Sequence, residues 1–195
     1  MHCIEQRRSI RKFKDIPVAK ELIIELVAAA RLAPSAKNRQ PWKFIVYSGD
    51  KKDELLGAMQ KGIENTEKVL LHTGDASGIP DAKNTLRIMR QAPVIIIVMN
   101  TGGSSPYEEI STEHRTTEIC DTLSIGAAIE NLLLTAQENG LGTLWIANTL
   151  YAYDALCEYI GESGQLVSAV AVGYPDESPN ARPRNPLGEI LEFRT

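Results

Sequence analysis

A stretch of apolar residues between positions 117 and 139 constrains the fold of this chain more than any other feature. Drawn as a helix, it carries hydrophobic side chains around much of its circumference, including Ile125, Ile129 and Leu132. Gly140 follows at once, in the position where glycine commonly ends a helix. A helix without a wide polar face belongs in the centre of a fold or in a subunit interface, and we expect this one in either place.

The remaining periodicity predicts a chain that mixes helices with short strands. Residues 93–98 are β-branched and apolar on both faces, which is typical of a buried strand. Further strands are expected at residues 43–47, 143–146 and 166–172. Further helices are expected at residues 19–32, 50–60, 84–89 and 154–160. Gly74, Gly78 and Pro80 mark residues 71–82 as a loop.

The chain has 195 residues and no internal repeat, so we expect a single domain covering residues 1–195. Its character changes after Pro175. Residues 176–188 contain several prolines and show no apolar periodicity. Such a tail is expected to cross the surface and dock at a distant place, and residues 189–193 are expected to form a last strand.

Composition excludes several functional classes. The formal net charge of −4 does not favour a nucleic-acid-binding surface. The longest uninterrupted apolar run, residues 92–99, is too short to cross a bilayer, which needs roughly 20 residues, so no membrane partner is expected. Three widely spaced cysteines offer no disulfide framework, and a reduced, cytoplasmic setting is the simplest interpretation.

Familiar catalytic patterns are missing from the sequence. It contains no GxxxxGK[ST] phosphate loop and no GxSxG nucleophile turn. Gly140 and Gly142 follow a helix and enter a strand, which is the reverse of the order in a dinucleotide-binding loop. His2, His72 and His114 are isolated, and no metal site is expected. A chain of this kind suits a bound cofactor that carries the reaction.

Two groups of arginines stand at opposite ends of the chain. Arg7, Arg8 and Arg11 surround Ser9, while Arg182 and Arg184 flank a proline near the end. Arginines this close repel each other unless an anion lies among them, and guanidinium groups bind phosphate through paired hydrogen bonds. We therefore expect both ends to converge on one phosphorylated cofactor. The alternative for the first group is a solvated basic run.

The segment after the first long helix, residues 33–42, is also unusual. It reads APSAKNRQPW, which is rich in hydrogen-bonding groups and is stiffened by two prolines. One interpretation is a structured connection from helix to strand, with Trp42 filling the core. The other is a segment that contacts the cofactor.

Taken together, these segments resemble the nitroreductase family of flavin enzymes. The resemblance rests on RRSIRKF near the start, PSAKNRQPWKF, GAAIENLLLTAQENGLGTLW, and the closing GYP…RPRNPLGEI, which stand in the family's order and spacing. It covers nearly the whole chain. It implies an α+β homodimer with a central mixed, mainly antiparallel sheet flanked by helices, FMN at the interface, and domain-swapped tails in which residues 176–195 dock on the partner subunit.

The resemblance also implies roles for individual residues. The FMN phosphate and ribityl chain would be held by Arg7, Arg8, Ser9, Arg11, Arg182 and Arg184, with Arg11 also reaching the pyrimidine edge. The flavin ring would be contacted from the partner subunit by Pro34, Ser35, Ala36, Asn38 and Gln40. The other face would be lined by Ile146 and Ala147, with the Ala147 N–H near flavin N5. The pyrimidine edge would also meet Asn84 and Arg87.

The activity implied by the resemblance is oxidoreduction by a ping-pong mechanism. NADH or NADPH would supply hydride, and nitroaromatics, quinones or another flavin would be the small-molecule acceptors. No side chain is expected to be catalytic. Residues 101–113 are the expected rim that shapes acceptor choice. Alternatives are a flavin-binding protein for storage or sensing, and a flavin enzyme of the same fold with other chemistry. Relatives often carry a hydroxyl at Ala36 and glycine or glutamate at Ala147-Asn148, so these two departures bear on substrate preference.

Overall fold

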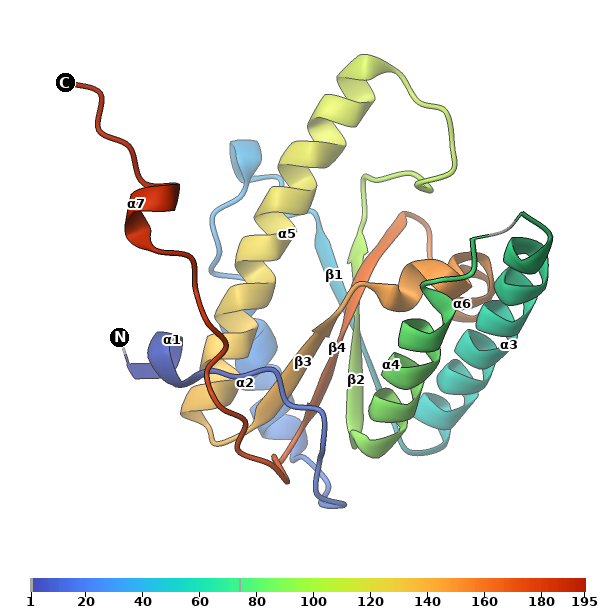
Figure 1. The fold of residues 1–195 in the computed structure, drawn as a ribbon, viewed down its shortest axis with the longest axis horizontal. Coiled ribbons are helices and arrows are strands. Elements are labelled where there is room, and N and C mark those ends of the chain that lie inside the picture. The colour runs from blue at the N-terminus through green and yellow to red at the C-terminus, as the bar shows by residue number, and fades with distance from the viewer. Residues whose placement is uncertain (1, 74) are drawn as a thin grey trace.

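The computed structural model describes residues 2–73 and 75–195 and shows an α+β fold (Figure 1). A four-stranded sheet lies between two layers of helices. One face is covered by α2 (Lys20–Ala30) and α5 (Thr112–Glu138). The other is covered by α3 (Gly49–Thr73), α4 (Ile79–Gln91) and α6 (Tyr153–Ile160). The short helix α1 (His2–Gln6) contacts α5 at the N-terminus.

The strands are arranged in the order β1-β2-β4-β3, and every neighbouring pair is antiparallel. Their bounds are β1 (Trp42–Ser48), β2 (Val94–Asn100), β3 (Gly142–Ile146) and β4 (Gln165–Gly173). The parallel component expected for a mixed sheet is limited to an isolated bridge between Ser9 and Thr143, beside the outer edge of β3. No described strand pairs with the opposite edge, that of β1.

The central strand β2 explains why the fold has two hydrophobic layers. All seven of its residues are buried, and successive side chains point to opposite faces. Ile95, Ile97 and Met99 pack with α3, α4 and α6, whereas Val94 and Ile96 pack with α2 and α5. The apolar run in the sequence is therefore a strand with helices on both sides, as expected.

Helix α5 occupies the centre of the fold, one of the two places expected from its sequence. Ile125, Ala128, Ile129 and Leu132 are fully buried against the sheet and α2. The helix is long and apolar enough to cross a membrane by length and composition alone. Its apolar surface is explained here by core packing, and its first half carries buried polar residues.

The structure corrects several of the expected element boundaries. The predicted helix at 50–60 continues to Thr73, and the predicted loop at 71–82 is too long at both ends, because α3 runs into it and α4 already begins at Ile79. Pro80 lies in the first turn of α4, where a missing N–H costs nothing, so it opens the helix instead of interrupting it. Helix α5 begins five residues earlier than expected, with the Ser111 hydroxyl accepting a hydrogen bond from the His114 N–H.

The C-terminal tail leaves β4 beside the N-terminal segment and then extends away from the body (Figure 1). The Lys14 N–H donates to the Tyr174 carbonyl and the Asp176 N–H to the Lys12 carbonyl, both at 2.9 Å. The strand predicted at 189–193 is wrong, since the structure has only the one-turn helix α7 (Leu187–Ile190) there. Leu187, Ile190 and Phe193 are exposed, and no strand in the described part of the chain pairs with them.

Candidate functional site

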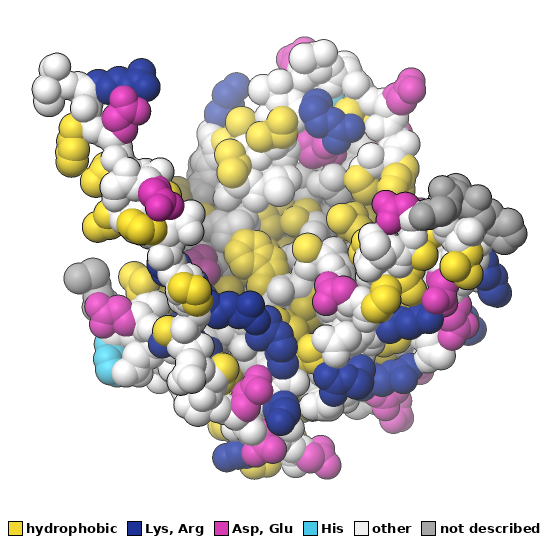
Figure 2. Space-filling model, in the orientation of Figure 1, with side chains coloured by type: hydrophobic (Ala, Val, Ile, Leu, Met, Phe, Trp, Pro, Cys, Tyr) yellow, Lys and Arg dark blue, Asp and Glu magenta, His cyan; other side chains and the backbone are white. Residues whose placement is uncertain are grey.

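The arginines from both ends of the chain line one cavity of about 290 Å³. Arg7, Arg8 and Arg11 enter it from the segment after α1, together with Ser9. Arg182 and Arg184 enter it from the tail. Figure 2 shows basic side chains gathered where the tail crosses the body. The structure thus brings together the two arginine groups that the sequence placed about 170 residues apart, and the cavity they line is here called the arginine cavity.

These five arginines are largely without acidic partners in the described part of the chain. Arg7 has a long ion pair with Glu130, with Nε 3.6 Å from Oε1. The other four form no ion pair there, and Arg8, Arg11 and Arg184 donate to backbone carbonyls close to them in sequence. Several positive charges around one hollow produce a site that attracts an anion.

A second cavity, of about 230 Å³, adjoins the first because Arg11 lines both. It lies between the end of β3 and one face of α4. Of the other residues predicted for the site, Asn84, Ile146 and Ala147 line it. Arg87 does not line it and instead donates to Asn84 Oδ1 from Nη2 at 2.9 Å and from Nε at 3.3 Å. We call this second hollow the strand-end cavity.

A hydrogen-bonded cluster at the strand-end cavity was missed by sequence reasoning. The Asn148 amide follows β3 and donates from Nδ2 to Asp81 Oδ2 at 2.6 Å and to Thr85 Oγ1 at 3.1 Å. Asp81, Asn84, Thr85 and Ile88 have the i, i+3, i+4, i+7 spacing of a single helix face. The loop expected at 71–82 hides this spacing, because it places Asp81 outside the helix.

The segment of residues 34–40 lies against the first half of α5 and lines neither of these two cavities. Lys37, Asn38 and Gln40 have φ angles of 54°, 55° and 49°, a left-handed conformation that costs roughly 1–2 kcal/mol for each residue with a side chain. Inside the segment, the Gln40 N–H donates to Ser35 Oγ at 3.1 Å. Pro34, Ser35, Ala36, Asn38 and Gln40 are therefore apart from the arginines of their own chain.

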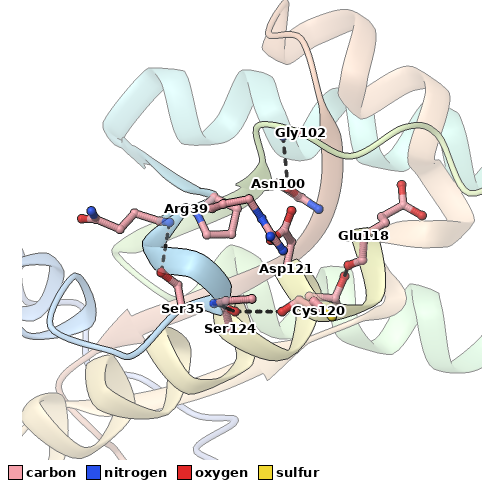
Figure 3. Close-up of polar contacts among 12 residues, drawn as sticks. Ser35, Arg39, Asn100, Gly102, Glu118, Cys120, Asp121 and Ser124 are labelled. Carbon is pink, nitrogen blue, oxygen red and sulfur yellow. Dashed lines mark hydrogen bonds and ion pairs between the residues drawn. The ribbon is translucent and has the colours of Figure 1, made fainter. Parts of the chain in front are cut away.

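Two side chains of α5 hold this segment in place (Figure 3). Arg39 donates from Nε to Asp121 Oδ1 at 2.8 Å, and its Nη2 lies 2.7 Å from the same oxygen. The Ala36 N–H donates to Ser124 Oγ at 3.2 Å. The Asp121 side chain is only 4% exposed, so the ion pair is largely shielded from water.

The expected rim, residues 101–113, is attached to the body at several points. The Ser104 N–H donates to Glu118 Oε1 at 2.8 Å. The Tyr107 ring meets the Tyr153 ring edge-on, with centroids 5.8 Å apart. Burial raises the pKa of the Tyr153 hydroxyl to about 12, with a further contribution from the Cys157 thiol beside it. The rim therefore has a defined conformation next to the residues that follow β3.

The described residues contain no group of three or more His, Cys, Asp or Glu side chains that could hold a metal ion. The arrangement of helices and strands agrees with that of known structures. The family model described as the Nitroreductase family matches residues 4–174. The chain belongs to the nitroreductase family.

Relatives of this nitroreductase-family chain include proteins named for different activities. A nitrobenzene nitroreductase of Ectopseudomonas oleovorans is 26% identical, and the match covers 98% of this chain and 94% of the relative. An iodotyrosine deiodinase of Thermotoga neapolitana is 28% identical, covering 98% and 95%. A structure from Desulfovibrio desulfuricans solved in complex with FMN is 27% identical, with a TM-score of 0.72, covering 100% of this chain and 95% of that one.

Proposed function

We propose that this nitroreductase-family protein is an FMN-dependent oxidoreductase that passes hydride from NADH or NADPH to a small-molecule acceptor. The observation that carries the proposal is the arginine cavity, into which five arginines project while only one of them has an ion pair in the described part of the chain. The relative solved in complex with FMN supports the same cofactor. Nitroaromatics, quinones and flavins are the proposed acceptors, in a ping-pong cycle.

The arginine cavity fits the phosphate of FMN. A phosphate monoester is doubly charged near neutral pH, and a charge-assisted hydrogen bond to it contributes roughly 1.5–3 kcal/mol. Arg7, Arg8 and Arg11 approach from one side, and Arg182 and Arg184 from the other. Both sides are already fixed near each other by the backbone pairing of the tail with the N-terminal segment.

The strand-end cavity fits the ring end of the same cofactor. Arg11 lies between the two cavities, so a ligand whose phosphate sits among the arginines extends toward β3. Ile146 provides an apolar wall, and the polar side chains of Asn84 and Asn148 provide partners for a heterocyclic edge. FMN, when bound, supplies the hydride chemistry, and the chain's residues bind and orient it. We propose no catalytic side chain, and Ala147 contributes only a backbone N–H.

We further propose that the protein works as a homodimer, because the contact segment 34–40 is separated from the arginines of its own chain. A second copy would bring its segment to the open side of the strand-end cavity. The segment is mostly exposed and yet conformationally defined, as expected for a surface that meets a partner.

The chain also has a groove that could bind the tail of such a partner. A groove of about 1160 Å³ runs between α2 and the unpaired edge of β1, with Ile24, Phe44 and Val46 in its wall. The tail presents Leu187, Ile190, Leu191 and Phe193 to solvent. Lys20 and Arg31 on the groove complement Glu189 on the tail. We propose that residues 176–195 of each chain cross to the other subunit and fill this groove.

The purified protein tests the proposal directly. It should be yellow, and its flavin absorbance should bleach when NADH or NADPH is added without oxygen and recover when a nitroaromatic or quinone is added. Protein that stays colourless and takes up no FMN contradicts the proposed cofactor. Yellow protein that neither nicotinamide bleaches favours a storage or sensing role.

A second candidate function is reductive chemistry of another kind in the same site. It is favoured by the iodotyrosine deiodinase among the relatives, which matches the chain over nearly its whole length. Reoxidation of the reduced protein by an iodinated phenol, with release of iodide, would distinguish this candidate from a nitroreductase.

A further inference from the structure

We propose that Asp121 is a positioning residue that sets the conformation of residues 34–40, the segment that completes the flavin site of the second subunit. The inference rests on the proposed function. Asp121 would not touch the cofactor itself. It would act through Arg39, which it holds from inside the same chain.

The contact between Asp121 and Arg39 has the geometry of a specific anchor (Figure 3). Two guanidinium nitrogens of Arg39 lie 2.7 and 2.8 Å from a single carboxylate oxygen. The carboxylate belongs to the rigid central helix, and Arg39 is its only ion-pair partner in the described residues. A buried carboxylate that loses its counter-charge is strongly disfavoured, so the helix holds Arg39 in one position.

Arg39 lies among the three residues of the segment that have a strained, left-handed backbone. Lys37 and Asn38 precede it and Gln40 follows it, and all three are left-handed without being glycine. Ser124, three residues beyond Asp121 on α5, accepts a second hydrogen bond from the segment, at the Ala36 N–H. Two anchors on one helix face thus fix both halves of the turn.

This arrangement does little for the core of its own chain. Residues 37–40 are exposed, and none of them belongs to either hydrophobic layer of the core. Strained residues persist only where the surroundings hold them, and such strain gathers where a ligand or partner is contacted. The geometry therefore points to contact with the second subunit's cofactor as the reason for the anchor.

Glu118 provides a matched control on the same helix. It is another carboxylate with a side chain only 4% exposed, three residues before Asp121. Its partners are Arg115 and the Ser104 N–H, so it holds the rim and not residues 34–40. Replacing either acid by its amide removes one buried charge and preserves volume.

The test compares Asp121→Asn, Arg39→Gln, the double variant and Glu118→Gln with the wild type. One readout is the FMN dissociation constant, measured by quenching of flavin fluorescence. The other is the rate of trypsin cleavage after Lys37 in protein stripped of FMN. We expect both single variants and the double variant to weaken FMN binding by the same factor, about tenfold, and to speed this cleavage. Glu118→Gln should keep the FMN dissociation constant within about twofold.

Two results would overturn the inference. One is unchanged FMN binding in Asp121→Asn, or in Arg39→Gln if the Asp121 variant does not fold. The other is losses that add in the double variant, because Asp121 would then not act through Arg39. The proposed function has a separate failure, which is wild-type protein that does not retain FMN. Cleavage after Lys37 needs no cofactor, and an unchanged rate in Asp121→Asn overturns the anchor in that case as well.

Discussion

The backbone N–H of Arg11 donates to Oε1 of Glu177 at 2.5 Å, so a carboxylate at the start of the tail is bonded beside one of the cavity's arginines. This contact joins residues 166 positions apart in the chain. The contact helps to explain why the tail arginines lie close to the N-terminal arginines. A short apolar side chain at position 177 would remove this bond and leave the tail held by its backbone pairs.

We predict that Glu177→Ala lowers the free energy of unfolding by about 1–3 kcal/mol, because an N–H that donates to a charged group loses its acceptor. Glu177→Gln keeps an oxygen in place and should cost less. Urea denaturation of both variants measures the difference. Equal losses in the two variants would show that charge, and not the hydrogen bond, is responsible.

The arginine cavity predicts the effect of removing its charges. Arg7→Ala and Arg184→Ala should each weaken FMN binding by about 10- to 100-fold, because each removes a charge-assisted hydrogen bond to phosphate. Lys61→Ala, on the exposed side of α3, is the control and should bind normally. Riboflavin, which has no phosphate, should bind all four proteins with similar affinity. A riboflavin affinity that falls in parallel would contradict a phosphate role.

Asp81 places a carboxylate at the strand-end cavity, held by the Asn148 amide at 2.6 Å. A negative charge near a flavin disfavours the added electrons of its reduced form. Asp81→Asn should therefore raise the midpoint potential of bound FMN. Spectroelectrochemical titration measures the potential, and Glu67→Gln, whose carboxylate pairs with Lys83 outside the cavity, is the control. A potential that falls or does not move would place the flavin ring elsewhere.

Tyr153 predicts a dependence of stability on pH. Its pKa is raised from the ordinary tyrosine value of about 10 to about 12 in the folded protein, so the folded state keeps the proton more tightly. The contribution is complete below pH 10 and is lost as the pH rises through 12. It amounts to about 2–3 kcal/mol. Tyr153→Phe should lose less stability than the wild type between pH 9.5 and 12 in denaturation experiments. Parallel pH profiles would contradict this assignment.

The proposed tail exchange predicts that removal of residues 187–195 weakens the dimer. Val46→Glu should have the same effect, because it places a charge in the groove that would receive the tail of the other subunit. Sedimentation velocity at several protein concentrations measures both. Val69→Glu changes an even more exposed valine, on α3 and outside that groove, and should leave the dimer intact. An unaffected dimer in the truncated protein would contradict the exchange.

The sequence predicted the elements whose signals are local and strong. The run 93–98 and the long apolar helix were placed correctly, because burial on both faces leaves a continuous hydrophobic pattern. Gly78 and Pro80 favour a loop in the sequence, but the same residue types that interrupt helices also stand where helices begin. The strand predicted at 189–193 is wrong because none of the described strands pairs with those residues.

For the site, the arginines could be predicted because like charges in a cluster imply an anion. Asn84, Ile146 and Ala147 came only from family resemblance, and the structure places them beside Arg11. Asp121 and Glu118 gave no signal, because a carboxylate inside an apolar helix is recognised only when its distant partner is known. The left-handed backbone at Lys37 could not be predicted either, because lysine as a residue type does not indicate that conformation.

Two residues separate Arg184 from the apolar end of the tail that begins at Leu187. If that end binds the other subunit, the position of Arg184 in the arginine cavity depends on whether the two subunits are associated. Loading with cofactor and association of the two chains then become one equilibrium. Dilution alone should empty the protein of flavin, and an excess of flavin should drive separated chains back into pairs.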